Sequence, residues 1–189
     1  TRFDGADVHD LAASDGVLFA AAENGLWSST DGRAWTRFGG ITTPVTRVAA
    51  TAGRVAVGGR DGVRIARIAD GAFTAVESAR FAVRELRARS GTFAASGEGV
   101  ELAAELGGEW QRIPAEGAQR VRGLDVDAEG VIHVAVDTAK GARTACIVDG
   151  AVELVWTPMR GGAIQRAACG EYGFLACVDP ATGVTFVEL

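Results

Sequence analysis

The chain of 189 residues is 48% hydrophobic and 23% charged, which is the balance of an ordinary globular protein, and its apolar runs are too short to cross a bilayer. The formal net charge of −5 argues against general affinity for nucleic acid or an anionic membrane, because both depend on an excess of Lys and Arg. We therefore expect one domain, with no nucleic-acid partner and no membrane insertion.

The cysteines say little about function. Cys146, Cys169 and Cys177 are an odd number and lack the CxxC spacing of a zinc site, so buried reduced thiols are the simplest interpretation. Reduced thiols favour a cytoplasmic location. The sequence starts at Thr1 without a basic segment followed by an apolar one, and a secreted or periplasmic location stays open.

Two series of glycines divide the chain into repeats. One series recurs every 37 to 43 residues at Gly16, Gly53, Gly91, Gly130 and Gly173. The other recurs every 37 to 42 residues at Gly25, Gly62, Gly99, Gly141 and Gly183. Because the two series keep in phase over five periods, they indicate a tandem repeat.

Each repeat alternates apolar residues with small or polar ones over short segments, which predicts β-strands. In the first repeat (8–40), strands begin at Val8, Val17, Leu26 and Ala34, and Asp15-Gly16 supplies a tight hairpin turn. The pattern of four strands returns in residues 45–78, 83–115 and 119–158.

The last repeat (163–189) has three predicted strands and lacks the fourth. Residues 1–3 (Thr-Arg-Phe) match residues 36–38, the fourth strand of the first repeat, so we expect residues 1–4 to complete the last repeat and close the ring. The predicted fold is therefore all-β, a five-bladed β-propeller of four-stranded antiparallel blades in which residues 1–189 form a single domain.

The segment from Ser29 to Trp35 reads Ser-Thr-Asp-Gly-Arg-Ala-Trp. It resembles the Asp-box, or BNR repeat, of sialidase-like β-propellers, and residues 70–73, 107–110 and 149–152 resemble degraded copies of it. The resemblance implies structural roles in a turn for Ser29, Asp31, Gly32 and Trp35. It implies a fold more than an activity, because Asp-box propellers include sialidases, sorting receptors and photosystem assembly factors.

Candidate functional residues lie at the start of the first strand of each repeat, which lines the channel of a propeller. One aligned position holds His9, Thr46, Arg84, Arg122 and Gln165, and the next holds Asp10, Arg47, Glu85, Gly123 and Arg166. The arginines could hold a carboxylate, a phosphate or an acidic side chain by forked hydrogen bonds. The alternative is a solvated channel in which Asp10 and Glu85 balance nearby arginines.

We expect a non-enzymatic binding or scaffold propeller that mediates protein or glycan interaction within a larger assembly, since the loops are short. Its binding residues would be His9, Arg47, Arg84, Arg122 and Arg166. The alternative is a small glycoside hydrolase or sialidase-like enzyme with Asp10 and Glu85 as its catalytic pair. No nucleotide-binding or metal-ligand motif is present, so we expect no cofactor and no metal. An exposed Trp27 would support glycan binding, whereas a packed Trp27 would remove the aromatic platform.

Overall fold

A computed structural model describes residues 5–148, 151–156, 166–169, 174–179 and 183–188. For Ala142, and from Val148 onward, the description is limited to the backbone. The described chain forms five antiparallel β-sheets, which follow one another in sequence order.

Four of these sheets have four strands each. The first sheet contains β1 (Val8–Ser14), β2 (Val17–Ala22), β3 (Gly25–Ser29) and β4 (Thr36–Arg37). The second contains β5 (Arg47–Thr51), β6 (Arg54–Gly59), β7 (Gly62–Arg67) and β8 (Thr74–Ala75). The third contains β9 (Glu85–Arg89), β10 (Thr92–Ser96), β11 (Leu102–Leu106) and β12 (Glu109–Arg112). The fourth contains β13 (Ala118–Val126), β14 (Ile132–Thr138), β15 (Gly141–Val148) and β16 (Ala151–Trp156).

The fifth sheet has three strands, β17 (Arg166–Cys169), β18 (Phe174–Asp179) and β19 (Gly183–Glu188). A single 3-10 turn, η1 (Glu77–Ala79), lies in the connection between the second and third sheets and was not expected from the sequence. Within each sheet the strands pair in chain order, so every connection inside a sheet is a hairpin. The predicted repeat of hairpin-connected strands is confirmed for the first four sheets.

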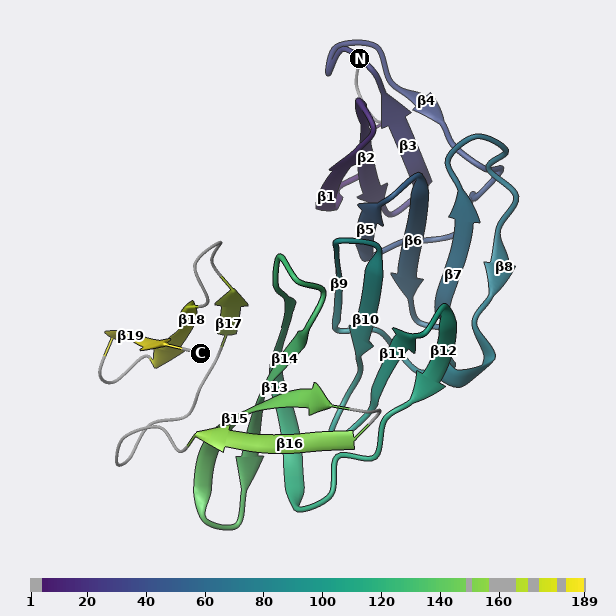
Figure 1. Cartoon of the computed structure of the whole chain (residues 1–189). Coiled ribbons are helices and arrows are strands. Elements are labelled where there is room, and N and C mark those ends of the chain that lie inside the picture. Colours follow the sequence, from purple (N-terminus) through teal and green to yellow (C-terminus); the bar gives the residue numbers. More distant parts are fainter. Residues whose placement is uncertain (1–4, 149–150, 157–165, 170–173, 180–182, 189) are drawn as a thin grey trace.

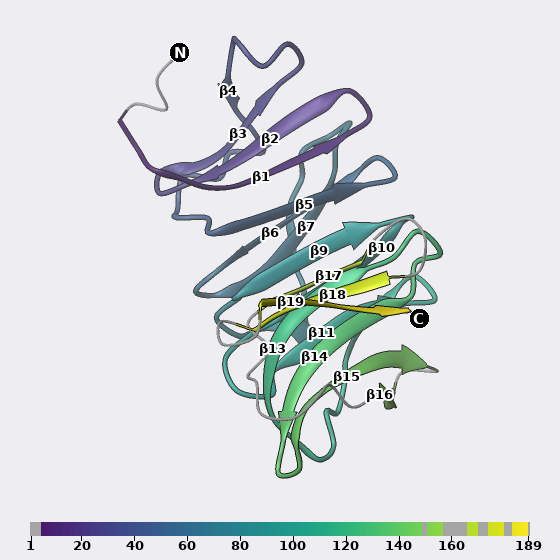
Figure 2. The same ribbon diagram turned by 90° about the vertical axis from the view of Figure 1, so that its left-hand side faces the viewer.

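The sheets stand face to face in an open arc (Figures 1 and 2). The first strands of successive sheets are neighbours: β1 contacts β5, β5 contacts β9, β9 contacts β13 and β13 contacts β17. The first and fifth sheets stand at the two ends of the arc, which is not closed (Figure 1). Residues 1–4, predicted to complete the last repeat, lie outside the described residues, and the closed five-bladed ring stays a prediction.

The hydrophobic core is divided among the interfaces between sheets. Side chains alternate across each strand, so one set faces the preceding sheet and the other faces the following sheet. Phe19 and Leu26 of the first sheet share one cluster with Val48 and Val55 of the second. Val63 shares the next cluster with Leu86 and Phe93, and Leu102 shares the third with Leu124 and Ile132. Burial of these side chains holds each sheet against its neighbour.

In the first three sheets the hairpins between the first two strands have the predicted geometry. Asp15-Gly16 has φ angles of 53° and 75°, Ala52-Gly53 has 48° and 71°, and Ser90-Gly91 has 50° and 84°. Two successive positive φ angles define the type I′ turn, which matches the twist of the paired strands. The prediction of tight turns at these three glycines is confirmed. In the fourth sheet the tight turn expected at Glu129-Gly130 is instead a longer loop, residues 127–131, in which Gly130 but not Glu129 has a positive φ.

Hydrogen bonds connect these turns from one sheet to the next. The Asp15 carboxylate accepts the Gly53 N–H at 2.8 Å, and the Thr51 hydroxyl accepts the Gly91 N–H at 3.1 Å. The Ser90 hydroxyl donates to the carbonyl oxygen of Ala128. The same rim of the arc is therefore linked across its first four sheets, which fixes neighbouring sheets relative to each other.

Candidate functional site

The turn between β3 and β4 is organised by two side chains. The Ser29 hydroxyl accepts the Gly32 N–H at 2.9 Å, and Asp31 Oδ1 accepts the N–H groups of Arg33 at 2.8 Å and Ala34 at 2.9 Å. Trp35 Nε1 donates to the carbonyl oxygen of Gly32 at 3.3 Å. These bonds satisfy the backbone of the turn, and they occupy the Asp31 carboxylate.

The same contacts set the acidity of Asp31. Hydrogen bonds from the N–H groups of Ala34 and Arg33, and then from the Ser29 hydroxyl, hold the pKa of Asp31 below its usual value of 3.8. A lowered pKa keeps Asp31 ionised at neutral pH, where it acts as an acceptor only.

Asp10 and Glu85, the alternative catalytic pair, each bind the backbone of the following sheet. Asp10 Oδ2 accepts the Val48 N–H at 3.1 Å, and Glu85 Oε2 accepts the Leu124 N–H at 2.8 Å. The two carboxylates therefore reach into two different interfaces, between the first and second sheets and between the third and fourth.

The predicted binding residues are distributed in a similar way. Arg47 Nε donates to the carbonyl oxygen of Arg84 at 2.5 Å, and Arg122 Nε pairs with Asp137 Oδ2 at 2.6 Å. His9 and the Arg84 side chain are exposed, and neither makes a hydrogen bond or ion pair with another described residue. Arg166 begins β17, and its side chain lies outside the described part. Arg47 and Arg84 are therefore neighbours across two sheets, whereas Arg122 is paired within the fourth sheet.

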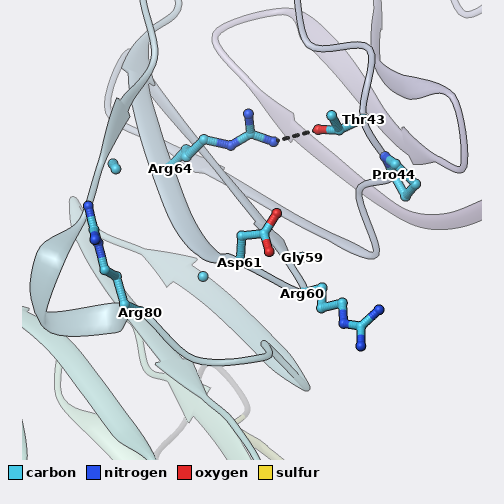
Figure 3. Close-up of a pocket in the computed structure, with 9 residues that line it drawn as sticks. Thr43, Pro44, Gly59, Arg60, Asp61, Arg64 and Arg80 are labelled. Atoms are coloured by element: carbon cyan, nitrogen blue, oxygen red, sulfur yellow. Dashed lines mark hydrogen bonds between the residues drawn. The ribbon is translucent and has the colours of Figure 1, made fainter.

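A cavity of about 320 Å³ opens at a different place on the second sheet (Figure 3). We call it the arginine pocket. Its walls come from the connection between the first two sheets, the β6–β7 turn, β7, β8 and the connection after η1. It is lined by Thr43, Pro44, Gly59, Arg60, Asp61, Gly62, Arg64, Ala75 and Arg80.

Two backbone contacts build the floor of the arginine pocket. Gly62 has a φ of 109°, and a Cβ added there would lie 2.5 Å from the carbonyl oxygen of Ala79. Glycine therefore lets the connection between the second and third sheets pass against the β6–β7 turn. The Val83 N–H donates to the Gly59 carbonyl at 3.0 Å, which ties the end of this connection to the end of β6.

The pocket is lined by more positive than negative groups. Arg64 Nη2 donates to Thr43 Oγ1 at 3.1 Å, so its guanidinium is held over the pocket (Figure 3). Arg80 pairs with Glu77 at 2.6 Å, but the two side chains are 64% and 72% exposed and the pair is solvent-screened. Arg60 makes no hydrogen bond or ion pair with another described residue. Asp61 is the one carboxylate in the lining.

The lining of the arginine pocket has side chains suited to an anion. Guanidinium groups present several N–H donors in a plane, which matches a carboxylate or a phosphate. Sequence reasoning missed the site because it searched the first strands, whereas Arg60 and Arg64 flank the turn of the glycine series at Gly62. The three charges Arg60, Asp61 and Arg64 around that glycine were the available signal.

Trp27 is packed and does not form an aromatic platform. It is 6% exposed, clusters with Ala20 and Ala22, and lies under the Arg37 guanidinium, whose carbon is 4.8 Å from the ring centre. Its Nε1 donates to Asn24 Oδ1 at 2.9 Å. Glycan binding thus loses the support that an exposed Trp27 would have given.

Two further properties concern the described residues alone. Their helical structure includes nothing long and apolar enough to span a membrane. Among the same residues, no three His, Cys, Asp or Glu side chains gather as metal ligands would.

No protein-family model matches the sequence, and no curated protein matches it. Solved structures do resemble the fold. The computationally designed protein Ika8 superimposes with a TM-score of 0.74 at 12% identity, over 96% of this chain and 58% of Ika8. YCF48, solved bound to a D1 peptide, gives 0.70 at 13% identity, over 97% of this chain and 64% of YCF48.

The WD40 β-propeller domain of Doa1 gives a TM-score of 0.66 at 12% identity, over 95% of this chain and 63% of that one. At these identities the likeness shows the fold alone: the chain has the all-β architecture of β-propellers, with four-stranded antiparallel sheets. It spans about three fifths of the length of the propellers it matches.

Proposed function

We propose that this chain is a non-enzymatic binding module of the β-propeller type, which holds an acidic segment of a protein partner in the arginine pocket. The observation that carries the proposal is the grouping of Arg60, Arg64 and Arg80 around one open cavity in a chain whose net charge is −5.

Several features support a protein partner. Turns and connections supply part of the pocket's wall, and binding residues often lie on such segments. YCF48 was solved with a peptide, and another similar chain belongs to the mitotic checkpoint complex. The hydrolase alternative has no comparable support, because Asp10 and Glu85 bind backbone in separate interfaces.

The test measures binding of a fluorescent peptide of alternating Glu and Gly by anisotropy, beside a Gln-Gly peptide of the same length. We expect the acidic peptide to bind and the Gln-Gly peptide not to bind. Raising the ionic strength should weaken the complex, because the contacts are exposed charges. Arg64→Ala combined with Arg60→Ala should weaken binding about tenfold or more, since each removes charge-assisted hydrogen bonds worth about 1.5–3 kcal/mol.

Arg67→Ala is the matched control, because Arg67 is exposed at the end of the same strand β7 and lies outside the arginine pocket. It should leave peptide binding unchanged. The free energy of unfolding of every variant should lie within about 0.5 kcal/mol of the wild-type value, as is usual for exposed substitutions. Equal loss of binding in Arg67→Ala would reduce the effect to net charge and contradict a specific pocket.

A further inference from the structure

One face of the first sheet is apolar and only partly covered: Ala20, Ala22 and Trp27 on it are buried, but its edge toward β1 is exposed. Val8 and Leu11 of β1 and Leu18 of β2 are 38%, 66% and 37% exposed. We call this surface the free face. By the strand register it lies on the face opposite Phe19 and Leu26, which pack against the second sheet. The first sheet stands at the end of the arc (Figure 2).

The same repeat positions are buried in the second, third and fourth sheets. The position of Leu11 is held by Val48, Leu86 and Leu124, which are 3%, 1% and 0% exposed. The position of Leu18 is held by Val55, Phe93 and Ile132, at 0%, 0% and 1%. The position of Val8 is held by Val45, Val83 and Val121, at 1%, 8% and 3%.

The reason for the difference is the neighbouring sheet. Val48 and Val55 are covered by Phe19 and Leu26 of the preceding sheet. Leu86 and Phe93 are covered in the same way by Ala56 and Val63. The free face therefore has the composition of an interface that occurs three times in the described molecule, but it has no preceding sheet against it.

The curvature of the arc leaves room for such a sheet. Nearly the whole chain superimposes on Ika8 and YCF48, yet it accounts for 58% and 64% of their lengths. The five sheets thus match part of a longer chain in each case.

We propose that the free face is the docking surface for one further four-stranded antiparallel β-sheet of the same repeat, lying outside these 189 residues. Its facing side would carry aromatic, leucine and alanine side chains in the pattern of Phe19, Ala21 and Leu26. It would pack against the first sheet in the way that the first sheet packs against the second.

The test adds a second copy of the chain's own first sheet at the position where the further sheet is proposed to pack. A fused chain carries an extra copy of residues 5–44 joined directly to Val8, which reproduces the native step from Pro44 to Val45 because Val8 and Val45 are equivalent. Leu11→Cys is introduced in the original copy of the fused chain and in the parent chain. Maleimide labelling at position 11 is followed by peptide mass spectrometry, so the native cysteines do not interfere.

We expect labelling at position 11 to be fast in the parent chain and at least tenfold slower in the fused chain. Val100→Cys is the matched control, since Val100 is 43% exposed in the turn between β10 and β11, and its rate should be the same in both chains. Leu11→Asp should lower the melting temperature of the fused chain and leave that of the parent unchanged.

Three results would overturn the proposal. The first is equal labelling of position 11 in the parent and a folded fused chain. The second is slow labelling in a parent that sediments as a dimer, which would make a second copy the occupant. The third is slow labelling in a monomeric parent, which would assign the face to the chain's own last repeat. If the fused chain misfolds, a second fusion with residues 45–82 before Val8 repeats the test with a different sheet.

Discussion

The first and third sheets carry the same repeat in opposite surroundings. The third sheet is covered on both sides, and its Leu86 and Phe93 are 1% and 0% exposed. The first sheet has a neighbouring sheet on one side only, and its Leu11 is 66% exposed. Its β3–β4 turn is nevertheless closed by the hydrogen bonds of Ser29 and Asp31, whereas the equivalent segment of the third sheet, Gly107-Gly108-Glu109-Trp110, has neither residue.

This difference shows that the repeat determines where strands and turns lie. The neighbouring sheets determine how much each side chain contributes to the stability of the fold. A leucine at one repeat position is a core residue in the third sheet and a surface residue in the first. Substitutions at equivalent positions should therefore have unequal effects, and those effects measure the surroundings rather than the repeat.

The largest effect is expected from Leu86→Ala compared with Leu11→Ala. Removing a fully buried leucine leaves a cavity and costs about 2–5 kcal/mol, whereas an exposed leucine costs less than about 0.5 kcal/mol. Urea unfolding of both variants gives the two free energies of unfolding. Similar losses would mean that Leu11 is covered in solution, and the contrast between the two sheets would disappear.

A second pair of substitutions tests a position at which the second and third sheets differ. A Cβ at Gly62 would lie 2.5 Å from the Ala79 carbonyl oxygen, and a Cβ at Gly99 would meet no atom within 4 Å, although both glycines have positive φ. Gly99→Ala should cost about 1 kcal/mol for its backbone conformation, and Gly62→Ala about 1–3 kcal/mol more, since the connection must also move. Thermal unfolding of the two variants checks the order, and equal midpoints would contradict the close approach.

Much of the fold follows from the sequence because turns and strands are local. Glycines in the second turn position mark the hairpins that follow Asp15, Ala52 and Ser90, and alternation between the hairpins gives the strands. The boundaries are less accurate: a third strand predicted from Val100 begins at Leu102, because the turn around Gly99 extends further.

The candidate site is less predictable because it depends on how separate sheets meet. Alignment places Asp10 and Glu85 at one repeat position, but it does not show that each reaches a backbone N–H of the next sheet. The arginine pocket joins Arg64 of a strand to Arg80 of a connection, and only the packing of that connection against Gly62 brings them together. Membership of the Asp-box family and closure of the ring stay predictions.

The smallest effect concerns stability at acid pH. It compares the β3–β4 turn of the first sheet, which Asp31 binds, with the equivalent β7–β8 turn of the second sheet, which Asp70 binds. The pKa of Asp31 is lowered in the folded chain, so its contribution to stability is present above about pH 4 and is lost as the pH falls through the lowered pKa. Asp31→Asn keeps an acceptor oxygen but removes the titration. Its unfolding midpoint in urea should lie below that of the wild type at pH 7 and approach it at pH 3.

Asp70→Asn is the control, because the Asp70 carboxylate accepts one N–H, from Ala72 at 3.0 Å, in the equivalent turn of the second sheet. Its difference from the wild type should change less between pH 7 and pH 3 than that of Asp31→Asn. Parallel pH profiles for the wild type and Asp31→Asn would show that the ionised carboxylate contributes no more than a neutral acceptor. The β3–β4 turn would then be stabilised by the hydrogen bonds that Asp31 accepts and not by the negative charge of its carboxylate.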